Sequence, residues 1–213
     1  MMRTFIARFA LAGVALLGAA VAIGCTQVVT ETAKKAFEDR STDDQVTDTK
    51  IGAGILSRLA DKDKNLLLDV NVDVWEQRVM LTGTLDDPTV KQDVVKLVES
   101  DRRVRKIHDE LQIVTKAEQA QRREAAKNKD DSKKEGVGQA VNDFWIETKI
   151  NAKLISTRGV TSVNYRWRSV RNVVYLIGRA RSEGELTTVL GVILGTEGVT
   201  KAKHFVEIKP APK

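Results

Sequence analysis

The sequence predicts an α+β protein built from two tandem copies of one small αββαβ unit. Apolar residues recur at every fourth position in two segments, which is the period of an amphipathic helix. Shorter runs alternate apolar and polar residues, which is typical of strands with one buried face. The segment 47–57 reappears at residues 146–156, which indicates an internal duplication.

The N-terminal segment predicts an export signal. The 213-residue chain opens with Arg3 and Arg8 and then has no charged residue from Phe9 to Gly24. A basic start followed by about 15 apolar, mostly small residues is typical of a secretory signal. As a membrane span the segment is short, since a span needs roughly 20 strongly apolar residues. We therefore expect residues 1–24 to be a cleaved signal peptide.

The single cysteine, Cys25, directly follows the tripeptide A-I-G. This arrangement resembles a bacterial lipobox, although Ala22 stands where leucine is usual. The resemblance implies acylation of Cys25 and, with Thr26 rather than Asp after it, attachment to the outer membrane. Two alternatives stay open: Ala20 and Ala22 also form an A-x-A cleavage site that would give a soluble periplasmic protein, or the segment stays as an uncleaved anchor.

Two segments of the chain show no core-forming pattern. Residues 25–42 lack a strong period and predict a lipidated tether. Residues 116–138 are rich in charge and hold few large apolar side chains, so they predict a linker, whose Ala, Glu, Gln, Lys and Arg content allows a solvated helix. The folded domains are therefore expected at residues 43–115 and 139–213.

The duplication supplies a residue-by-residue alignment of the two units. At an offset of 99 residues, Thr49, Lys50, Ile51, Ala53 and Ser57 recur as Thr148, Lys149, Ile150, Ala152 and Ser156. Further along, Val70-Asn71 matches Val163-Asn164, Gly83 matches Gly178, and residues 104–114 match 199–209. These matches predict a hairpin loop two residues longer in the second unit, around Ser169 to Asn172.

Each unit is expected to open with a helix and continue with a hairpin. The helical stripes are Ile51, Ile55 and Leu59 in the first unit and Ile146, Ile150 and Leu154 in the second. Asn142 and Asp143 are candidate N-caps. The hairpin strands are indicated by Leu68, Val70, Val72 and Val74, by Val79 and Leu81, and by Val174 and Leu176.

A second helix and a last strand complete each unit. The second helix is expected to start near Asp87-Pro88 in the first unit and to cover Glu185 to Leu194 in the second. The last strands contain Ile107, Leu111 and Ile113, and Val199, Phe205 and Ile208. The predicted unit is a three-stranded mixed sheet with two helices on one face.

Charge divides unevenly between the two units. Residues 43–115 hold 11 basic and 15 acidic side chains, a net −4, whereas residues 142–213 hold 12 basic and 6 acidic side chains, a net +6. The second unit therefore predicts an acidic partner. In an exported protein the candidates are anionic phospholipid, lipopolysaccharide or peptidoglycan, and nucleic acid is not expected.

The first helix of the second unit offers a candidate lipid-binding site. Trp145, Lys149 and Lys153 form a stripe next to the core stripe of that helix. Trp beside Lys suits a membrane interface, where the ring lies at headgroup level and the ammonium groups meet phosphate. The structural alternative is a Trp packed on its own sheet edge beside solvated lysines.

The basic residues of the second hairpin are a weaker candidate. Arg166, Arg168 and Arg171 would extend an anionic-ligand surface, or else are solvated as arginines commonly are. Two histidines and one cysteine leave no metal site, and no phosphate loop or hydrolase motif occurs. We therefore expect no catalytic residues, no metal, no cofactor and no small-molecule substrate.

These features resemble the BON domain, a small αββαβ module of bacterial envelope proteins. The resemblance is carried by the T-K-I helix, the V-x-L-x-G strand ends at Gly83 and Gly178, the Gly198-Val199 turn and the N-D-F-W-I-E-T-K segment from Asn142. Signal peptide, lipobox and two units together resemble dual BON-domain outer-membrane lipoproteins of the division- and stress-associated lipid-binding type, which are related to osmotically inducible periplasmic BON proteins. Arg103 stands where that family usually has Gly.

The resemblance implies a function at the envelope. The chain would be a non-enzymatic, lipid-anchored protein on the periplasmic face of the outer membrane. It would contact an anionic phospholipid surface through the second unit and support outer-membrane integrity under stress. The alternative is a periplasmic chaperone or adaptor that acts on envelope proteins, with outer-membrane assembly proteins as possible partners and the acidic first unit as the partner surface.

Overall fold

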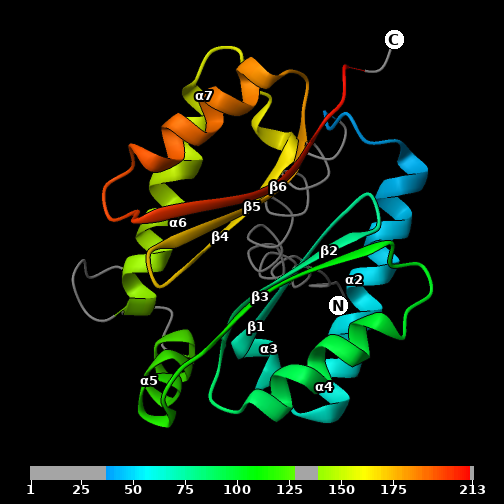
Figure 1. Ribbon diagram of the computed structural model, residues 1–213, viewed down its shortest axis with the longest axis vertical. Helices are drawn as coiled ribbons and strands as arrows, with labels where there is room; N and C mark the ends of the chain where they lie inside the picture. The colour runs from blue at the N-terminus through cyan, green and yellow to red at the C-terminus, as the bar shows by residue number, and fades with distance from the viewer. Residues whose placement is uncertain (1–36, 128–138, 212–213) are drawn as a thin grey trace, which may run out of the picture. The chain divides into compact units, whose positions relative to one another are not determined.

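Two domains of the same architecture make up the described chain (Figure 1). The structure, a computed structural model, describes residues 37–127 and 139–211, and residues 38–213 form one compact unit. The first domain comprises α2 (Thr42–Lys62), α3 (Leu66–Asp69), β1 (Val70–Trp75), β2 (Arg78–Leu85), α4 (Pro88–Glu99) and β3 (Lys106–Ile113). The second comprises α6 (Gln139–Ser156), the 3₁₀ helix η2 (Ser162–Asn164), β4 (Tyr165–Val170), β5 (Val173–Ala180), α7 (Glu183–Leu194) and β6 (Lys201–Ile208). The predicted α+β class and tandem αββαβ order are confirmed.

Each domain folds its strands into one three-stranded mixed sheet. β1 pairs antiparallel with β2, and β2 pairs parallel with β3. The second domain repeats this order with β4, β5 and β6. In Figure 1 the two long helices of each domain lie on one face of its sheet. The other face of each sheet is therefore free of that domain's own helices.

The second long helix of each domain begins at a capping side chain. Asp87 accepts a hydrogen bond from the backbone N–H of Thr89 at 2.7 Å, and Pro88 occupies the first turn. Ser182 accepts one from the backbone N–H of Glu185 at 3.1 Å. These are typical N-caps, and the predicted start near Asp87-Pro88 is confirmed.

The first helix of the second domain starts earlier than predicted. α6 begins at Gln139, so Asn142 and Asp143 lie inside the helix and cap nothing. Asp143 is instead buried, and its carboxylate accepts hydrogen bonds from the backbone N–H groups of Arg171 (2.9 Å) and Asn172 (3.0 Å). A buried carboxylate needs such donors, and here they come from the β4–β5 turn.

The first domain repeats this contact between helix and turn. The carboxylate of Asp48 on α2 accepts hydrogen bonds from the backbone N–H groups of Glu76 and Gln77, each at 2.7 Å. Asp48 and Asp143 therefore have the same task, which is to hold the hairpin turn of their domain against the first helix.

Both hairpins close through a two-residue turn in the left-handed region. The φ angles are 48° and 63° at Glu76 and Gln77, and 53° and 65° at Arg171 and Asn172. Two such residues form the type I′ turn, whose twist matches that of the strands. The turns have equal length, so the prediction of a longer second hairpin is wrong.

The equal hairpins also correct the alignment of the two domains. β1 and β4 begin 95 residues apart, at Val70 and Tyr165, and so do β3 and β6. The buried stripes of α2 and α6, which begin at Ile51 and Ile146, follow the same spacing. The sequence match at an offset of 99 was therefore displaced by one helical turn, and a residue's counterpart lies 95 positions away throughout. The match of Val70 to Val163 is likewise wrong.

The first strand of the first hairpin, β1, is shorter than predicted. Leu68 belongs to α3, not to a strand, and is 42% exposed. The short helices α3 and η2 precede β1 and β4 in equivalent places.

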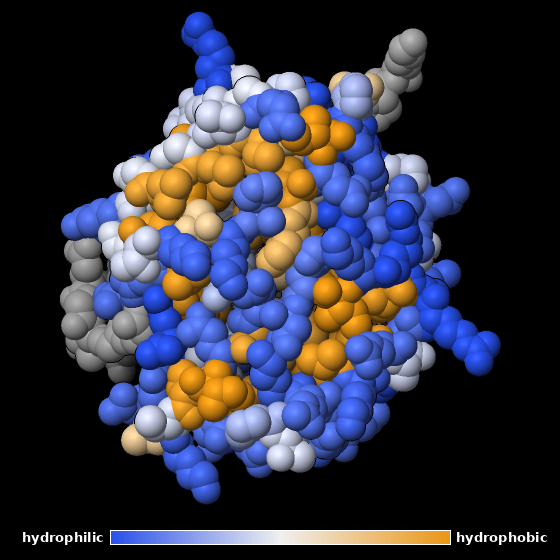
Figure 2. All heavy atoms as spheres, viewed as in Figure 1, coloured by the Kyte–Doolittle hydropathy of each residue, from blue (hydrophilic) through white to orange (hydrophobic). Residues whose placement is uncertain are grey.

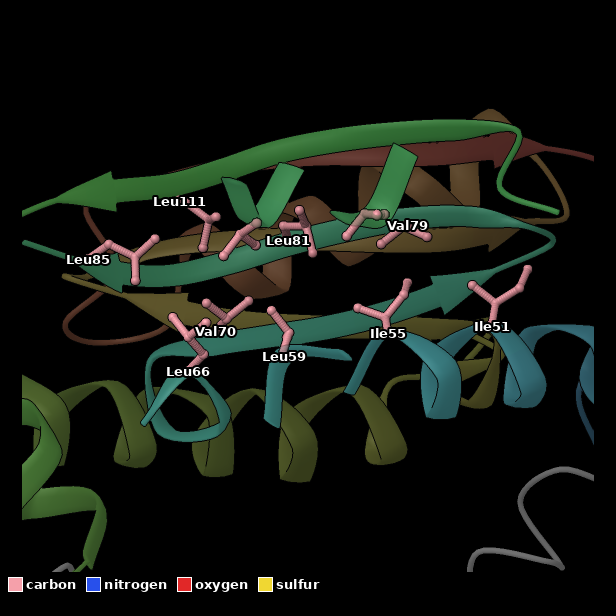
Figure 3. Close-up of a cluster of buried hydrophobic side chains, with 11 residues drawn as sticks. Ile51, Ile55, Leu59, Leu66, Val70, Val79, Leu81, Leu85 and Leu111 are labelled. Carbon is pink, nitrogen blue, oxygen red and sulfur yellow. The ribbon is translucent and has the colours of Figure 1, made fainter. Parts of the chain in front are cut away.

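The core of each domain lies between its sheet and its helices. Figure 3 shows Ile51, Ile55 and Leu59 on α2 pointing toward the strands, where Val79 and Leu81 meet them. In the second domain the core is formed by Ile146, Ile150, Leu154, Tyr165, Val174, Leu176, Ala180, Leu186, Val189 and Ile193. The predicted helical stripes are thus confirmed as core.

The predicted linker and the end of the predicted tether contribute to the fold. α5 (Lys116–Lys127) packs on α3, because buried Asp69 accepts hydrogen bonds from Gln119 (2.6 Å) and Arg123 (2.9 Å). Glu38 and Asp39 are likewise bonded to the second domain. The solvated helix expected at the start of the linker is therefore a packed one.

The face of the molecule shown in Figure 2 is largely hydrophilic. On the face shown in Figure 2, apolar residues form separate patches among hydrophilic ones. Within residues 37–127 and 139–211, no helix combines the length and hydropathy required for a membrane span. The predicted signal peptide and Cys25 lie outside the described residues.

Candidate functional site

The core packing of α6 decides which of its side chains point outward. Ile146, Ile150 and Leu154 are buried against the sheet. At 100° per residue, the positions on the opposite side of the helix include Phe144, Thr148, Ala152 and Ile155. Phe144 is 48% exposed and Ile155 is 63% exposed. We call the set Phe144, Trp145, Thr148, Ala152 and Ile155 the α6 outer face; all five side chains are uncharged.

Trp145 lies at the edge of this face. Its side chain is half-buried and meets Phe144 edge-on, with ring centroids 5.8 Å apart. The indole N–H is enclosed and finds no hydrogen-bond acceptor among the described residues. Since a buried Trp N–H usually has a partner, this donor carries an unmet bond. The predicted lipid-binding residues did not include Phe144 and Ile155. Their positions opposite the core stripe of the helix could have identified them from the sequence.

Both predicted lysines reach the C-terminal end of α7. Lys149 Nζ lies 2.9 Å from the carboxylate of Glu197 and holds the pKa of that carboxyl below its usual value. Lys153 Nζ donates to the carbonyl of Gly195 at 3.1 Å and to the hydroxyl of Thr196 at 3.3 Å. A cation at a helix C-terminus is stabilising there.

The counterpart of Lys153 in the first domain shows that this contact is part of the fold. Arg58 on α2 donates to the carbonyl of Leu97 at 3.1 Å and to the hydroxyl of Ser100 at 3.0 Å, at the end of α4. The two domains thus use a cation at this position for the same purpose. Of the predicted trio, Lys153 is the residue with a clear structural role.

Three apolar residues of the α6 outer face are not repeated at the equivalent positions of the first domain. The counterparts of Phe144, Trp145 and Ile155 are Thr49, Lys50 and Ala60. Aromatic and aliphatic side chains in the second domain therefore replace polar or small ones in the first. This difference lies on a solvent-facing surface, where packing of the domain's own core does not require it.

The arginines expected to extend an anionic-ligand surface are paired within the chain. Arg166 is bonded to Glu38, Arg168 to Asp73 at 2.8 Å, and Arg171 to Glu118 at 3.1 Å. They are therefore neither a free basic surface nor simply solvated. The sequence could not show this, because every partner lies far away along the chain.

Further ion pairs join basic residues of the second domain to acidic residues of the first. Lys203 lies 2.7 Å from Glu110, and Lys209 is bonded to Glu76. The net positive charge of the second domain predicts an acidic partner, and the first domain supplies part of that acidic surface. These acids are consequently not a free surface for the adaptor alternative.

One half-buried carboxyl group near the site was not expected. Glu147 on α6 accepts a hydrogen bond from the backbone N–H of Ser169 at 2.8 Å, with Arg168 4.0 Å away. Desolvation raises the pKa of Glu147 to about 7, and these two neighbours only partly offset it. The α6 face that points to the sheet therefore holds a carboxyl that titrates near neutral pH.

The histidines do not form a metal site. His108 stacks on Phe205 with ring centroids 4.0 Å apart, and burial lowers the pKa of His108 to about 4. Within the described ranges, no cluster of three or more His, Cys, Asp or Glu side chains is arranged to hold a metal ion.

Comparison with known proteins identifies the repeated unit. The BON domain model matches residues 47–115 and 142–210. The chain is 28% identical over 140 residues to an uncharacterized protein in the gshII 5′ region of Anaplasma centrale, covering 66% of this chain and 82% of that protein. It is also similar to CdsD, a structural protein of the type III secretion system of Chlamydia trachomatis, with 11% identity, a TM-score of 0.32, and coverage of 73% and 93%. The C-terminal domain of CdsD matches with 10% identity, a TM-score of 0.29, and coverage of 73% and 96%.

Proposed function

Since the chain belongs to the BON domain family and carries two such domains in tandem, we propose that it is an envelope protein whose second domain contacts anionic phospholipid. BON domains are a non-catalytic family associated with phospholipid binding and with envelope proteins. The observation that carries the proposal is the α6 outer face, where Phe144, next to Trp145, and Ile155 are exposed. The first domain has Thr49, Lys50 and Ala60 at these positions.

The chemistry of this face suits the headgroup region of a bilayer. Phe144 and Ile155 lie on one side of α6, about 16 Å apart along the axis from the rise per residue, so both can enter the acyl boundary together. The half-buried ring of Trp145 meets Phe144 edge-on, and an indole at this place suits the headgroup level of the bilayer, because Trp is enriched at membrane–water interfaces.

Lys149 supplies the attraction to anionic lipid. Its partner Glu197 is 86% exposed, and an ion pair in solvent contributes about 0–1 kcal/mol. Exchange of this carboxylate for a lipid phosphate therefore costs little. Lys153 contributes charge near the surface while it stays bonded to the end of α7.

The proposal includes the lipid anchor at Cys25 and a place on the periplasmic face of the outer membrane, where the protein supports membrane integrity. An acyl anchor and a weak interfacial patch act together, because one weak membrane signal alone gives marginal attachment. In this arrangement the anchor holds the protein near the membrane, the α6 outer face enters the interface and Lys149 selects anionic lipid.

A vesicle titration tests the lipid contact without the anchor. Since residues 38–213 form one compact unit, the chain without its first 25 residues keeps both domains. We expect it to bind phosphatidylglycerol vesicles more tightly than phosphatidylcholine vesicles, with affinity falling as salt rises. Phe144→Ser, Trp145→Ala and Lys149→Glu should each weaken binding by about tenfold or more, roughly the loss of one buried apolar side chain or one charge contact.

The first domain supplies matched controls. Lys50→Ala changes the counterpart of Trp145, and Thr49→Ser changes the counterpart of Phe144, so neither should alter vesicle binding. Unchanged binding in all three α6 variants, with folding intact by circular dichroism, would refute the contact. Equal losses from the two control variants would show that the attraction is diffuse.

A further inference from the structure

The helix-free faces of the two sheets pack against each other. Their contact is an apolar cluster formed by Trp75, Met80, Val170, Tyr175 and Ile177. Trp75 and Met80 come from the first sheet and the other three from the second. The two domains are therefore joined through the sheet faces that their own helices leave uncovered.

This contact has local two-fold symmetry. β1 contacts β5, and β2 contacts β4; because β4 and β5 are the counterparts of β1 and β2, these are one contact with the roles of the domains exchanged. The side chains agree. His108 stacks on Phe205, and Glu110 pairs with Lys203, where Lys203 is the counterpart of His108 and Phe205 that of Glu110.

One pair lies on the axis of this symmetry. Asp73 on β1 and Arg168 on β4 are counterparts of each other, 95 positions apart, and they are bonded at 2.8 Å and 3.0 Å. A residue that meets its own counterpart marks the position where an identical pair of domains would bring identical residues together. Here that position carries opposite charges.

The axial pair distinguishes mixed pairing from pairing of like domains. Two first domains joined in this way would bring Asp73 against Asp73, and two second domains would bring Arg168 against Arg168. The Asp73 side chain is only 6% exposed, so like charges there would be poorly screened and repulsive.

The off-axis contacts of His108 and Glu110 do not discriminate in the same way. In a pair of first domains His108 would meet Glu110, and in a pair of second domains Lys203 would meet Phe205. Neither combination joins like charges, and Lys over an aromatic ring is attractive. The axial position therefore discriminates where these two contacts do not.

We infer that the helix-free sheet face of each BON domain is a pairing surface for another BON domain, and that the charges of Asp73 and Arg168 specify first-with-second pairing. The partner that fits the first domain is a BON sheet face with a cation at the axial position. The partner that fits the second is one with an anion there. Within this chain each domain satisfies the other.

Charge reversal tests the inference in the chain without its first 25 residues. Asp73→Arg and Arg168→Asp each place like charges on the axis. We expect each to lower the melting temperature by about 5 °C or more and to increase the radius of gyration in small-angle scattering as the domains separate. The double reversal restores opposite charges and should recover most of both losses.

Two controls keep the result interpretable. Because Arg168 also lies 4.0 Å from Glu147, the series is repeated with Glu147→Gln, which removes the repulsion that an Asp at 168 would meet. Asp93→Lys reverses an exposed ion pair inside the first domain, with Lys62, and should leave the radius of gyration unchanged.

The outcomes separate clearly. Single reversals that stay as compact and stable as the parent chain would overturn the inference. So would a double reversal that fails to recover stability in the Glu147→Gln background. Recovery there, with loss in both single variants, establishes that the axial charges select the partner, whether or not the α6 outer face binds lipid.

Discussion

In the first domain the outer side of the first long helix carries Thr49, Lys50 and Ala60, whereas in the second domain the same positions carry Phe144, Trp145 and Ile155. Inside, the two domains are nearly interchangeable. Asp48 and Asp143 hold equivalent turns, and Arg58 and Lys153 cap equivalent helices. The two domains therefore share the contacts that hold their turns and helix ends in place, and they differ on the solvent-facing surface of the first long helix.

The sheet faces add a second contrast. Arg168 and Lys203 in the second domain face Asp73 and Glu110 in the first. The charges on these faces are thus complementary where the domains meet. Internal residues should therefore respond alike to substitution in the two domains, and residues of the contact should respond differently.

The largest shared effect is expected at Gly83 and Gly178. A Cβ added at Gly83 would lie 2.0 Å from the carbonyl oxygen of Asp69, and one at Gly178 would lie 2.2 Å from that of Asn164. Both glycines also have positive φ angles, of 124° and 154°. Alanine at either site should therefore lower the free energy of unfolding by about 3 kcal/mol or more, measured by urea denaturation.

Gly191→Ala is the matched control for this pair. An added Cβ there meets nothing within 4 Å in the interior of α7, so alanine should stabilise by about 0.5–1 kcal/mol. If alanine lowered the free energy of unfolding strongly at Gly83 but not at Gly178, or the reverse, the two domains would not be equivalent at this position.

A second shared effect concerns the carboxylates that hold the hairpin turns. Asp48→Ala and Asp143→Ala each leave two backbone N–H groups without an acceptor, next to residues in the left-handed region. We expect each to cost about 2–3 kcal/mol of unfolding free energy, since buried unpaired donors are expensive. Asp93→Ala, on an exposed carboxylate, should cost under about 1 kcal/mol. A cost at only one of the two turns would show that the domains close their hairpins differently.

The sequence predicted the architecture and the core well because both follow from local periodicity. Alternation identified the hairpins, and the i, i+4 spacing identified Ile51 and Ile146 as starts of buried stripes. That same spacing misled the alignment of the helices. A stripe that repeats every four residues looks the same after a shift of one turn, so the T-K-I identity outweighed the true offset. The two hairpin turns contain no glycine, so nothing in the sequence indicated that all four turn residues have positive φ angles in a type I′ geometry.

The site was predicted in part for a different reason. Trp145 could be chosen from its chemistry, and Phe144 and Ile155 follow once the buried side of α6 is known. The partners of Arg166, Arg168 and Arg171 could not be predicted, because they depend on how the two domains and the segments beside them pack together. Charge imbalance predicted an acidic partner but did not predict that complementary acidic side chains lie in the same chain.

The smallest predicted effect distinguishes the two off-axis contacts by pH. Burial, with Lys106 and Arg78 nearby, lowers the pKa of His108 to about 4, and Glu207 only partly opposes this. The unfolded chain binds a proton at this residue below about pH 6.5, whereas the folded chain does so only near pH 4. Stability from the neutral His108–Phe205 stack is therefore full above pH 6.5 and is lost as the pH falls toward 4.

In the equivalent contact, between Glu110 and Lys203, no histidine titrates. A hydrogen bond to Glu110 raises the pKa of Lys203, so Lys203 stays charged throughout that range. We expect the parent chain to lose about 1–2 kcal/mol of unfolding free energy between pH 6.5 and 4 relative to His108→Phe, a value reduced by partial exposure of the ring. Lys203→Met should lower the free energy of unfolding at pH 6.5, where it removes the ion pair with Glu110. If His108→Phe and the parent chain show the same pH dependence in urea denaturation, His108 is not kept neutral by the contact, and the two halves of the interface are electrostatically alike.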